Sequence, residues 1–213
     1  MKSPLLVRSL GFVLAASLNV SVTFTPAALP ITGGASVSAP VARSAGGMPT
    51  LDNFVAAVKN RQPGQVVGVY VPRILALRVT QQPPNNPAYV SRQRGYATQF
   101  NVAANYDATA LLAHNYLSGA LFLNLAPGQE VDIIHGDGAV QRYLILIRRR
   151  FQAVNPTSLY SNFVDLDNGG AQLSSTDLFY QIYAGGDRVV FQTCLTAHGN
   201  TSWGRLFVIA TPL

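Results

Sequence analysis

The chain has 213 residues, of which 48% are hydrophobic and only 11% are charged, with a formal net charge of +6. Once the N-terminal region is set aside, this length suffices for one well-buried core but hardly for two domains. The low charge suits a strand-rich fold or a chain with a membrane-directed segment. It excludes a highly charged disordered chain.

The N-terminus has the layout of an export signal. Lys2 and Arg8 precede an uncharged stretch, residues 10–24, and no charged residue follows until Arg43. Polar residues in the later part of the stretch weaken its reading as a spanning helix, so residues 1–30 are interpreted either as a cleaved signal or as a retained membrane anchor. Both interpretations predict an extracellular or cell-surface location.

A low-charge segment follows and leads into the folded domain. Residues 31–50 are mostly Gly, Ala, Ser, Val and Pro, a composition that predicts a flexible tether, and we place the domain at 51–213. Apolar residues at the spacing of one helical face predict a short helix that Thr50 can cap, namely Leu51, Phe54, Val55 and Val58.

The rest of the domain reads mainly as strands. Short β-branched or aromatic runs alternate with turn residues, at 66–71, 74–79, 109–113, 131–134, 142–147, 189–193 and 206–210. Seven or more strands without regular helices between them predict an antiparallel sandwich or barrel. Residues 175–183 are the exception, because apolar residues on one face and a serine at the start predict a helix.

The single cysteine, Cys194, is the first candidate for chemistry. A lone thiol in an exported protein is inert and buried, intermolecular, or reactive. Cys194 follows the strand-like run 189–193 and precedes a polar segment, residues 196–203, which is predicted to be a loop. Its position alone fits a nucleophile facing a cleft and a small buried hydrophobe equally well.

Cys194 also stands in a pattern with two other polar residues. The tripeptide Gln192-Thr193-Cys194 closes one apolar run, and after ten further residues Arg205 opens the next. Upstream, the apolar run 111–114 ends in His114. This order, with Thr-Cys ending one strand and Arg beginning the next, resembles the signature of the sortase family.

The resemblance extends over residues 64–212, and the stretch 122–131 is similar to the family's segment after the histidine. It implies an all-β fold with short helices, built as a closed sortase-like β-barrel of about eight strands. The chain departs from the usual pattern at Ala113, where a glycine is common, at Phe191 in place of Leu, and at Glu130 in place of Asp. None of these departures removes a reacting group.

The resemblance implies a cysteine transpeptidase with Cys194, His114 and Arg205 as catalytic residues and no cofactor. The Cys194 thiolate would cleave the Thr–Gly bond of a sorting signal in a surface protein, and an amine on the cell surface or a pilin would capture the thioacyl group. His114 would transfer protons, and Arg205 would stabilise the oxyanion. Thr193 and Trp203 are the substrate-binding candidates, although Trp203 fits a core position equally well.

Each histidine has an alternative reading. His114 at the end of an apolar strand also fits a structural histidine. His198 lies four residues after Cys194, but a residue on a separate strand is better held, which favours His114. His135 belongs to a His-Gly-Asp-Gly sequence typical of a hairpin turn.

Other chemistries find little support in the sequence. The three histidines and one cysteine do not form a zinc pattern, and Asp165 and Asp167 are too few for a calcium loop, so no metal is expected. The basic run 148–150 places its side chains on alternating faces of a strand, which predicts a solvated strand edge and no nucleic-acid partner. The Ser-His-Gly-x-x-Cys motif of an L,D-transpeptidase is absent.

Two alternatives stay open. The barrel could serve as a non-catalytic surface binding module with an inert Cys194, or water could replace the amine and make the protein a cysteine peptidase. The pentapeptide at residues 29–33, Leu-Pro-Ile-Thr-Gly, fits a sorting signal but follows its hydrophobic run instead of preceding it. We interpret it as coincidence, with a self-substrate on the tether as the second reading.

Overall fold

The computed structural model describes residues 47–158 and 160–213. The predicted signal or anchor, most of the predicted tether and the pentapeptide at 29–33 lie outside the described residues. Helix α1 (Leu51–Val58) begins where the apolar spacing predicts, and the Thr50 hydroxyl accepts a hydrogen bond from the Asn53 backbone at 3.4 Å. No helix in the described ranges is long and apolar enough to cross a membrane.

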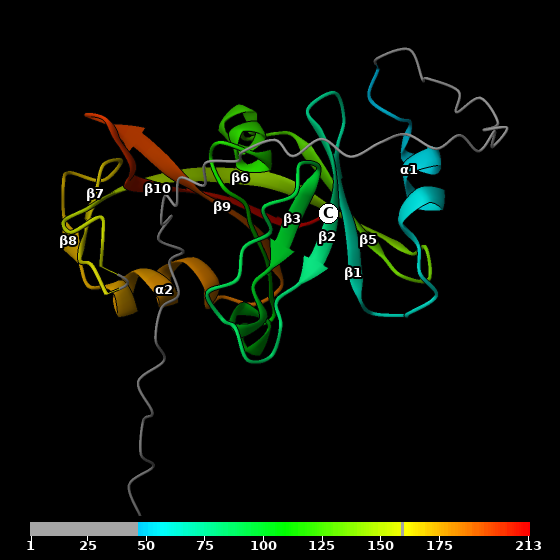
Figure 1. Ribbon diagram of the computed structural model, residues 1–213, viewed down its shortest axis with the longest axis horizontal. Helices are drawn as coiled ribbons and strands as arrows, with labels where there is room; N and C mark the ends of the chain where they lie inside the picture. Colours follow the sequence, from blue (N-terminus) through cyan, green and yellow to red (C-terminus); the bar gives the residue numbers. More distant parts are fainter. Residues whose placement is uncertain (1–46, 159) are drawn as a thin grey trace, which may run out of the picture.

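The central feature is a closed barrel (Figure 1). The strands in chain order are β1 (Val66–Val71), β2 (Leu75–Gln81), β3 (Tyr96–Gln99), β4 (Ala108–Leu112), β5 (Glu130–His135), β6 (Val140–Ala153), β7 (Phe163–Asp165), β8 (Gln172–Leu173), β9 (Arg188–Ala197) and β10 (Asn200–Pro212). Eight of them form a ring in the order β10-β9-β4-β3-β2-β1-β5-β6, which closes because β6 also pairs with β10. The predicted all-β class, with a closed barrel of about eight strands and short helices, is confirmed.

The predicted antiparallel arrangement is only partly correct, because β2 pairs with β3 and β4 pairs with β9 in parallel. Parallel neighbours need long crossover connections. The loop after β2 supplies the first, and four strands with helix α2 separate β4 from β9 in the chain. Two short 3₁₀ helices flank β4, namely η1 (Asn101–Tyr106) and η2 (Ser118–Asn124).

The basic run 148–150 does not form the solvated edge that the sequence predicted. It lies inside β6, where Arg149 is directly opposite Phe207 of β10. Arg149 Nη2 lies 2.5 Å from the Asp165 carboxylate, and Arg150 Nη2 lies 2.6 Å from Asp167. These pairs tie β6 to the β7 region and engage both carboxylates that had been considered as calcium ligands.

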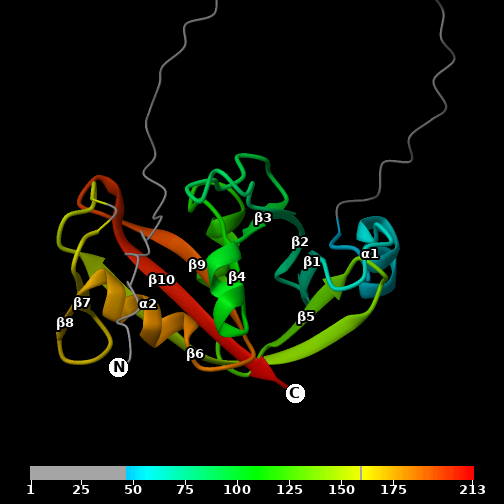
Figure 2. The ribbon, with the colours of Figure 1, turned by 90° about the horizontal axis from the view of Figure 1, so that it is seen from below.

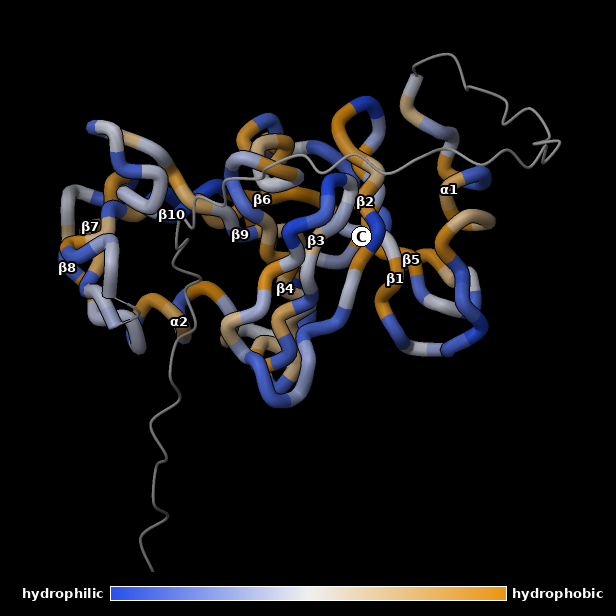
Figure 3. The backbone as a smooth tube through the Cα atoms, in the orientation of Figure 1, coloured by the Kyte–Doolittle hydropathy of each residue, from blue (hydrophilic) through white to orange (hydrophobic). Residues whose placement is uncertain are grey.

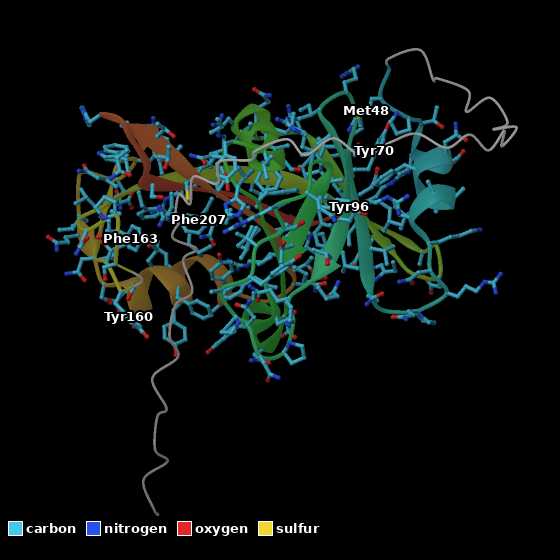
Figure 4. The ribbon with its side chains drawn as sticks, in the orientation of Figure 1. Met48, Tyr70, Tyr96, Tyr160, Phe163 and Phe207 are labelled. Atoms are coloured by element: carbon cyan, nitrogen blue, oxygen red, sulfur yellow. The ribbon has the colours of Figure 1, made fainter. Side chains whose placement is uncertain are left out.

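Apolar residues form one core inside the barrel and a second on its outer face. Helix α2 (Ser175–Tyr183) matches its predicted bounds, with Ser174 accepting a hydrogen bond from the Asp177 backbone at 3.1 Å. The helix lies beside β10 (Figure 2), and Figure 4 labels Phe207 of that strand. Tyr183 of the helix packs edge-on against Phe207, with ring centroids 6.2 Å apart. The hydropathy colouring shows apolar and polar stretches in turn along α2 (Figure 3), as expected of a helix with one face against the barrel. The helix therefore closes the outer core beside the β9–β10 hairpin.

Candidate active site

Cys194 and Arg205 face each other across the β9–β10 ladder. They are directly opposed in the antiparallel register, so their side chains leave the same face of the sheet. Cys194 is half-buried, whereas only 3% of Arg205 is exposed. The neighbouring strands thus bring together two residues that ten other residues separate in the chain.

The polar segment after Cys194 is not the predicted loop. Strand β9 continues to Ala197 and β10 begins at Asn200, and His198 and Gly199 form the turn with φ of 51° and 73°. Two successive left-handed residues match the right-handed twist of a two-residue hairpin. Cys194 therefore lies within a long strand, and the connection to Arg205 is a tight hairpin.

Backbone hydrogen bonds hold His114 beside β9. The residue follows the end of β4, and the preceding Ala113 donates its N–H to the Gln192 carbonyl at 3.2 Å. The Thr193 hydroxyl donates to the Ala113 carbonyl at 2.9 Å. On the other side, the Gly119 N–H donates to the His114 carbonyl at 3.0 Å. The position of His114 is therefore set by contacts on both sides of its backbone.

The His114 imidazole sits in a partly desolvated environment. It stacks on Tyr116 with ring centroids 5.1 Å apart and lies close to the backbone of Val90. Burial lowers the pKa of His114 below its ordinary value of 6.5, and the nearby positive charge of Arg92 lowers it further, whereas the Val90 contact opposes the shift. The imidazole is therefore mainly neutral at pH 7.

The loop that carries Val90 is fixed by one buried side chain. Gln82 is 3% exposed, and its Nε2 donates to the carbonyls of Pro87 and Tyr89 at 2.9 and 3.1 Å. Its Oε1 accepts a hydrogen bond from the Asn101 backbone at 3.2 Å. Gln82 thus anchors the loop to η1 and keeps Val90 within reach of the imidazole.

His114, Cys194 and Arg205 line one cleft, which we call the arginine cleft. Its empty volume is about 320 Å³, and its other lining residues are Val90, Leu112, Ala113, Gln192 and Thr193. A second cleft, the tyrosine cleft, has an empty volume of about 550 Å³ and shares only Cys194 with the first. It is lined otherwise by Asn115, Tyr116, Leu123, Leu195, Thr196 and Thr201. The thiol therefore lies where two clefts adjoin.

The electrostatic setting of Arg205 is unusual for a buried charge. Its Nη1 donates to the Ser202 and Gly204 carbonyls at 2.9 and 2.8 Å, but no carboxylate in the described ranges forms an ion pair with it. Burial lowers the pKa of Arg205, and the charge of the neighbouring Cys194 acts in the opposite direction. The guanidinium therefore lies buried directly opposite Cys194, with no carboxylate among the described residues to neutralise it.

Among the other sequence candidates, Thr193 also lines the arginine cleft, whereas Trp203 and His135 do not. Thr193 is 2% exposed and uses its hydroxyl to hold Ala113. Trp203 lines neither cleft and packs edge-on against the exposed His198, with centroids 6.1 Å apart. His135 ends β5 at its turn to β6. Within the described residues, no group of three His, Cys, Asp or Glu side chains could hold a metal ion.

Sequence reasoning quoted Gln192 only as part of a motif and assigned it no role. It lines the arginine cleft two residues before Cys194 and is 8% exposed. Its position on the same face of β9 as the nucleophile was readable from the alternation of a strand. Its partner, Tyr183 of α2, could not be read from any local pattern.

No protein-family model matches the chain, and no curated protein matches it in sequence. Among solved structures, sortase C-1 from Actinomyces oris is 12% identical, with a TM-score of 0.47 and coverage of 78% of this chain and 82% of that one. Sortase E1 from Streptomyces coelicolor, solved with a tripeptide in its active site, is 15% identical, with a TM-score of 0.44 and coverage of 72% and 91%. Clostridium perfringens sortase C, solved with the C-terminal cell wall sorting motif, is 14% identical, with a TM-score of 0.42 and coverage of 76% and 83%. All three are sortases, and at these values the likeness is one of fold and says nothing about the reaction.

Proposed function

We propose that the protein is a cysteine transpeptidase of the sortase type. It cleaves a sorting signal in surface proteins through a thioacyl intermediate on Cys194 and transfers the acyl group to an amine. The observation that carries the proposal is the buried Arg205, which has no carboxylate partner among the described residues and lies directly opposite Cys194. His114 lines the same cleft and supplies the third group that such a reaction needs.

The reaction begins with the thiolate. A neutral His114 takes the Cys194 proton, and the resulting negative charge on sulfur lies next to the Arg205 guanidinium. His114 lines the same cleft as Cys194, so its imidazole is the nearest base for this proton among the described histidines. The lowered pKa of His114 keeps the imidazole neutral in the resting enzyme and makes its protonated form a stronger acid.

The acyl transfer then proceeds in two halves. The thiolate attacks the scissile carbonyl carbon, the C–N bond breaks, and the imidazolium of His114 protonates the departing amine. The incoming amine gives a proton to the neutral imidazole as it attacks the thioester, and the C–S bond breaks. Arg205 N–H groups stabilise the oxyanion in both halves, an effect worth about 10²–10³ in rate for one such donor.

The two clefts provide separate binding places for the acyl side and the amine side of the scissile peptide bond. The arginine cleft holds the acyl donor, because it contains the cation that faces the developing oxyanion. The tyrosine cleft holds the departing and incoming amines, since it opens on the other residues around Cys194. His114 lines the arginine cleft and stacks on Tyr116, which lines the tyrosine cleft. The imidazole ring therefore lies next to a residue of each cleft.

A non-catalytic binding module is the weaker reading, because an inert thiol has no need of a buried cation opposite it. The test is incubation of the full chain with a Leu-Pro-Ile-Thr-Gly peptide and triglycine, followed by mass spectrometry. The proposal expects a product ending in Thr joined to triglycine, absent for Cys194→Ala. A product that ends in a free Thr carboxylate, with no triglycine attached, would identify a peptidase. If peptides of several sequences all remain uncleaved, both activities are refuted.

A further inference from the structure

Gln192 is a polar residue in an otherwise apolar part of the arginine cleft. It lies on the same face of β9 as Cys194, and its neighbours on that face are the buried Val190, Leu112 and Phe207. Only 8% of Gln192 is exposed. A carboxamide buried in such surroundings is destabilising unless its polar atoms form hydrogen bonds.

Tyr183 satisfies one end of this carboxamide. The tyrosine has no exposed surface, and its hydroxyl donates to Gln192 Oε1. Burial raises the pKa of Tyr183, so the hydroxyl stays protonated and remains a donor at any working pH. The contact fixes which end of the carboxamide faces α2 and turns Nε2 away from the helix.

The other end of the carboxamide has no hydrogen-bond partner among the described residues. Neither N–H of Gln192 Nε2 donates a hydrogen bond to any of the described residues. Because the residue lines the arginine cleft beside Cys194, these donors are directed to whatever fills the cleft. An apolar group placed there would leave them unsatisfied, whereas an oxygen acceptor would satisfy them.

We propose that Gln192 determines the specificity of the arginine cleft, by selecting acyl donors that present an oxygen acceptor on a side chain upstream of the scissile bond. Asn and Gln side chains are accepted there, and apolar side chains of equal size are rejected. Tyr183 is the positioning residue, which acts on specificity through Gln192. The inference rests on the proposed function, because it assumes that the acyl donor occupies this cleft.

The test uses irreversible inhibitors, so that it needs neither turnover nor an acceptor amine. Peptidyl chloromethyl ketones based on Leu-Pro-Ile-Thr carry Leu, Asn, Met or Gln in turn at each of the three positions before Thr. The Cys194 thiolate displaces chloride and forms a C–S bond, and intact mass spectrometry of the full chain gives the second-order rate. Iodoacetamide, which has no peptide, reports the reactivity of the thiol alone.

The expected result is a preference at one position, where Asn reacts about tenfold faster than Leu or Gln about tenfold faster than Met. Gln192→Met abolishes or inverts this preference, and each peptide rate is divided by the iodoacetamide rate of the same variant to remove any change in thiol reactivity. Gln192→Glu keeps an acceptor for Tyr183 but loses the donors, so it also abolishes the preference. Tyr183→Phe removes only the hydroxyl and weakens the preference severalfold.

Equal rates for all peptides, or a preference that survives Gln192→Met, overturn the proposal. If Gln192→Met does not fold, as judged by its melting temperature, Gln192→Glu and Tyr183→Phe decide the question. Failure of the proposed function gives a different signature, namely an iodoacetamide rate that is indifferent to His114 and Arg205. The two failures are therefore distinguishable in the same set of measurements.

Discussion

Arg205 lies directly across the β9–β10 ladder from Cys194, and its charge is buried without a carboxylate to balance it among the described residues. Desolvating a guanidinium costs several kcal/mol when no negatively charged partner offsets that cost. The arrangement is therefore explained by function better than by stability, because the charge becomes useful when Cys194 ionises or when an oxyanion forms beside it.

Replacing Arg205 should separate stability from catalysis. Arg205→Met removes the buried charge while keeping a long side chain, and we expect it to unfold at the same temperature or higher. Peptide cleavage should fall by about 10²–10³, because the oxyanion loses its donors. Thermal unfolding and turnover of the same sample check both parts, and a variant that loses stability and activity together would mark Arg205 as structural.

Gly119 should be intolerant of a side chain because of where it lies. A Cβ there would be 2.3 Å from the Thr193 hydroxyl and 2.5 Å from the Ala113 carbonyl, so the backbone that carries His114 would have to move. Gly119→Ala should destabilise the fold by about 1–3 kcal/mol and lower kcat by about a hundredfold, because the imidazole is displaced. The neighbouring exposed Ala120→Ser is the matched control, and equal kinetics for the two variants would contradict this account.

The pKa of His114 should respond to Arg92. Burial is the larger cause of the lowered pKa and Arg92 the smaller, so Arg92→Gln should raise the pKa toward 6.5 without reaching it. The titration of the His114 ring protons by NMR measures this directly. No change in Arg92→Gln would show that the arginine's charge is screened by solvent.

The lowered pKa of His114 also makes the free energy of unfolding depend on pH. Because the folded-state pKa of His114 is below its ordinary value of 6.5, the unfolded chain binds the proton more readily. The contribution of neutral His114 to the free energy of unfolding is present above about pH 6.5 and is lost as the pH falls from there through the folded-state pKa. Urea unfolding at pH 7.5 and pH 5 should show a smaller loss of stability in His114→Gln than in the unaltered chain.

Thr193 should act through the backbone rather than through the substrate. Thr193→Val keeps the shape but leaves the buried Ala113 carbonyl without its hydroxyl donor, which should cost about 1–3 kcal/mol of unfolding free energy. Thr193→Ser retains the donor and should recover most of that loss. If instead KM rises in Thr193→Val while stability is unchanged, the hydroxyl contacts substrate as the sequence suggested.

The two helices and most strands could be predicted because their signals are local. Apolar spacing and a capping hydroxyl gave the bounds of α1 and α2, and β1 coincides with its predicted run, residues 66–71. Strand β3, with the sequence Tyr-Ala-Thr-Gln, lacks an apolar alternation and is held by its parallel pairing with β2. Such pairing depends on residues far away in the chain, so no window around β3 reveals it.

The candidate site shows the same division. Motif resemblance selected three of the residues that line the arginine cleft, His114, Cys194 and Arg205. The segment 196–203 was misread because its Thr, Ser and Asn residues resemble a loop, whereas the left-handed residues at 198 and 199 make it a hairpin. The contribution of Gln192 emerged only from its contact with Tyr183, which tertiary packing of α2 creates.

The most direct test of the central claim is the rate of Cys194 alkylation by iodoacetamide as a function of pH. The full chain is compared with His114→Gln, Arg205→Met and the urea-unfolded protein. An activated nucleophile predicts that the folded chain reacts faster than the unfolded chain at pH 7, and that each substitution slows the folded chain by about tenfold. A folded thiol that reacts more slowly than the unfolded thiol at every pH, at a rate that neither substitution changes, would contradict the claim and leave the barrel as a binding module.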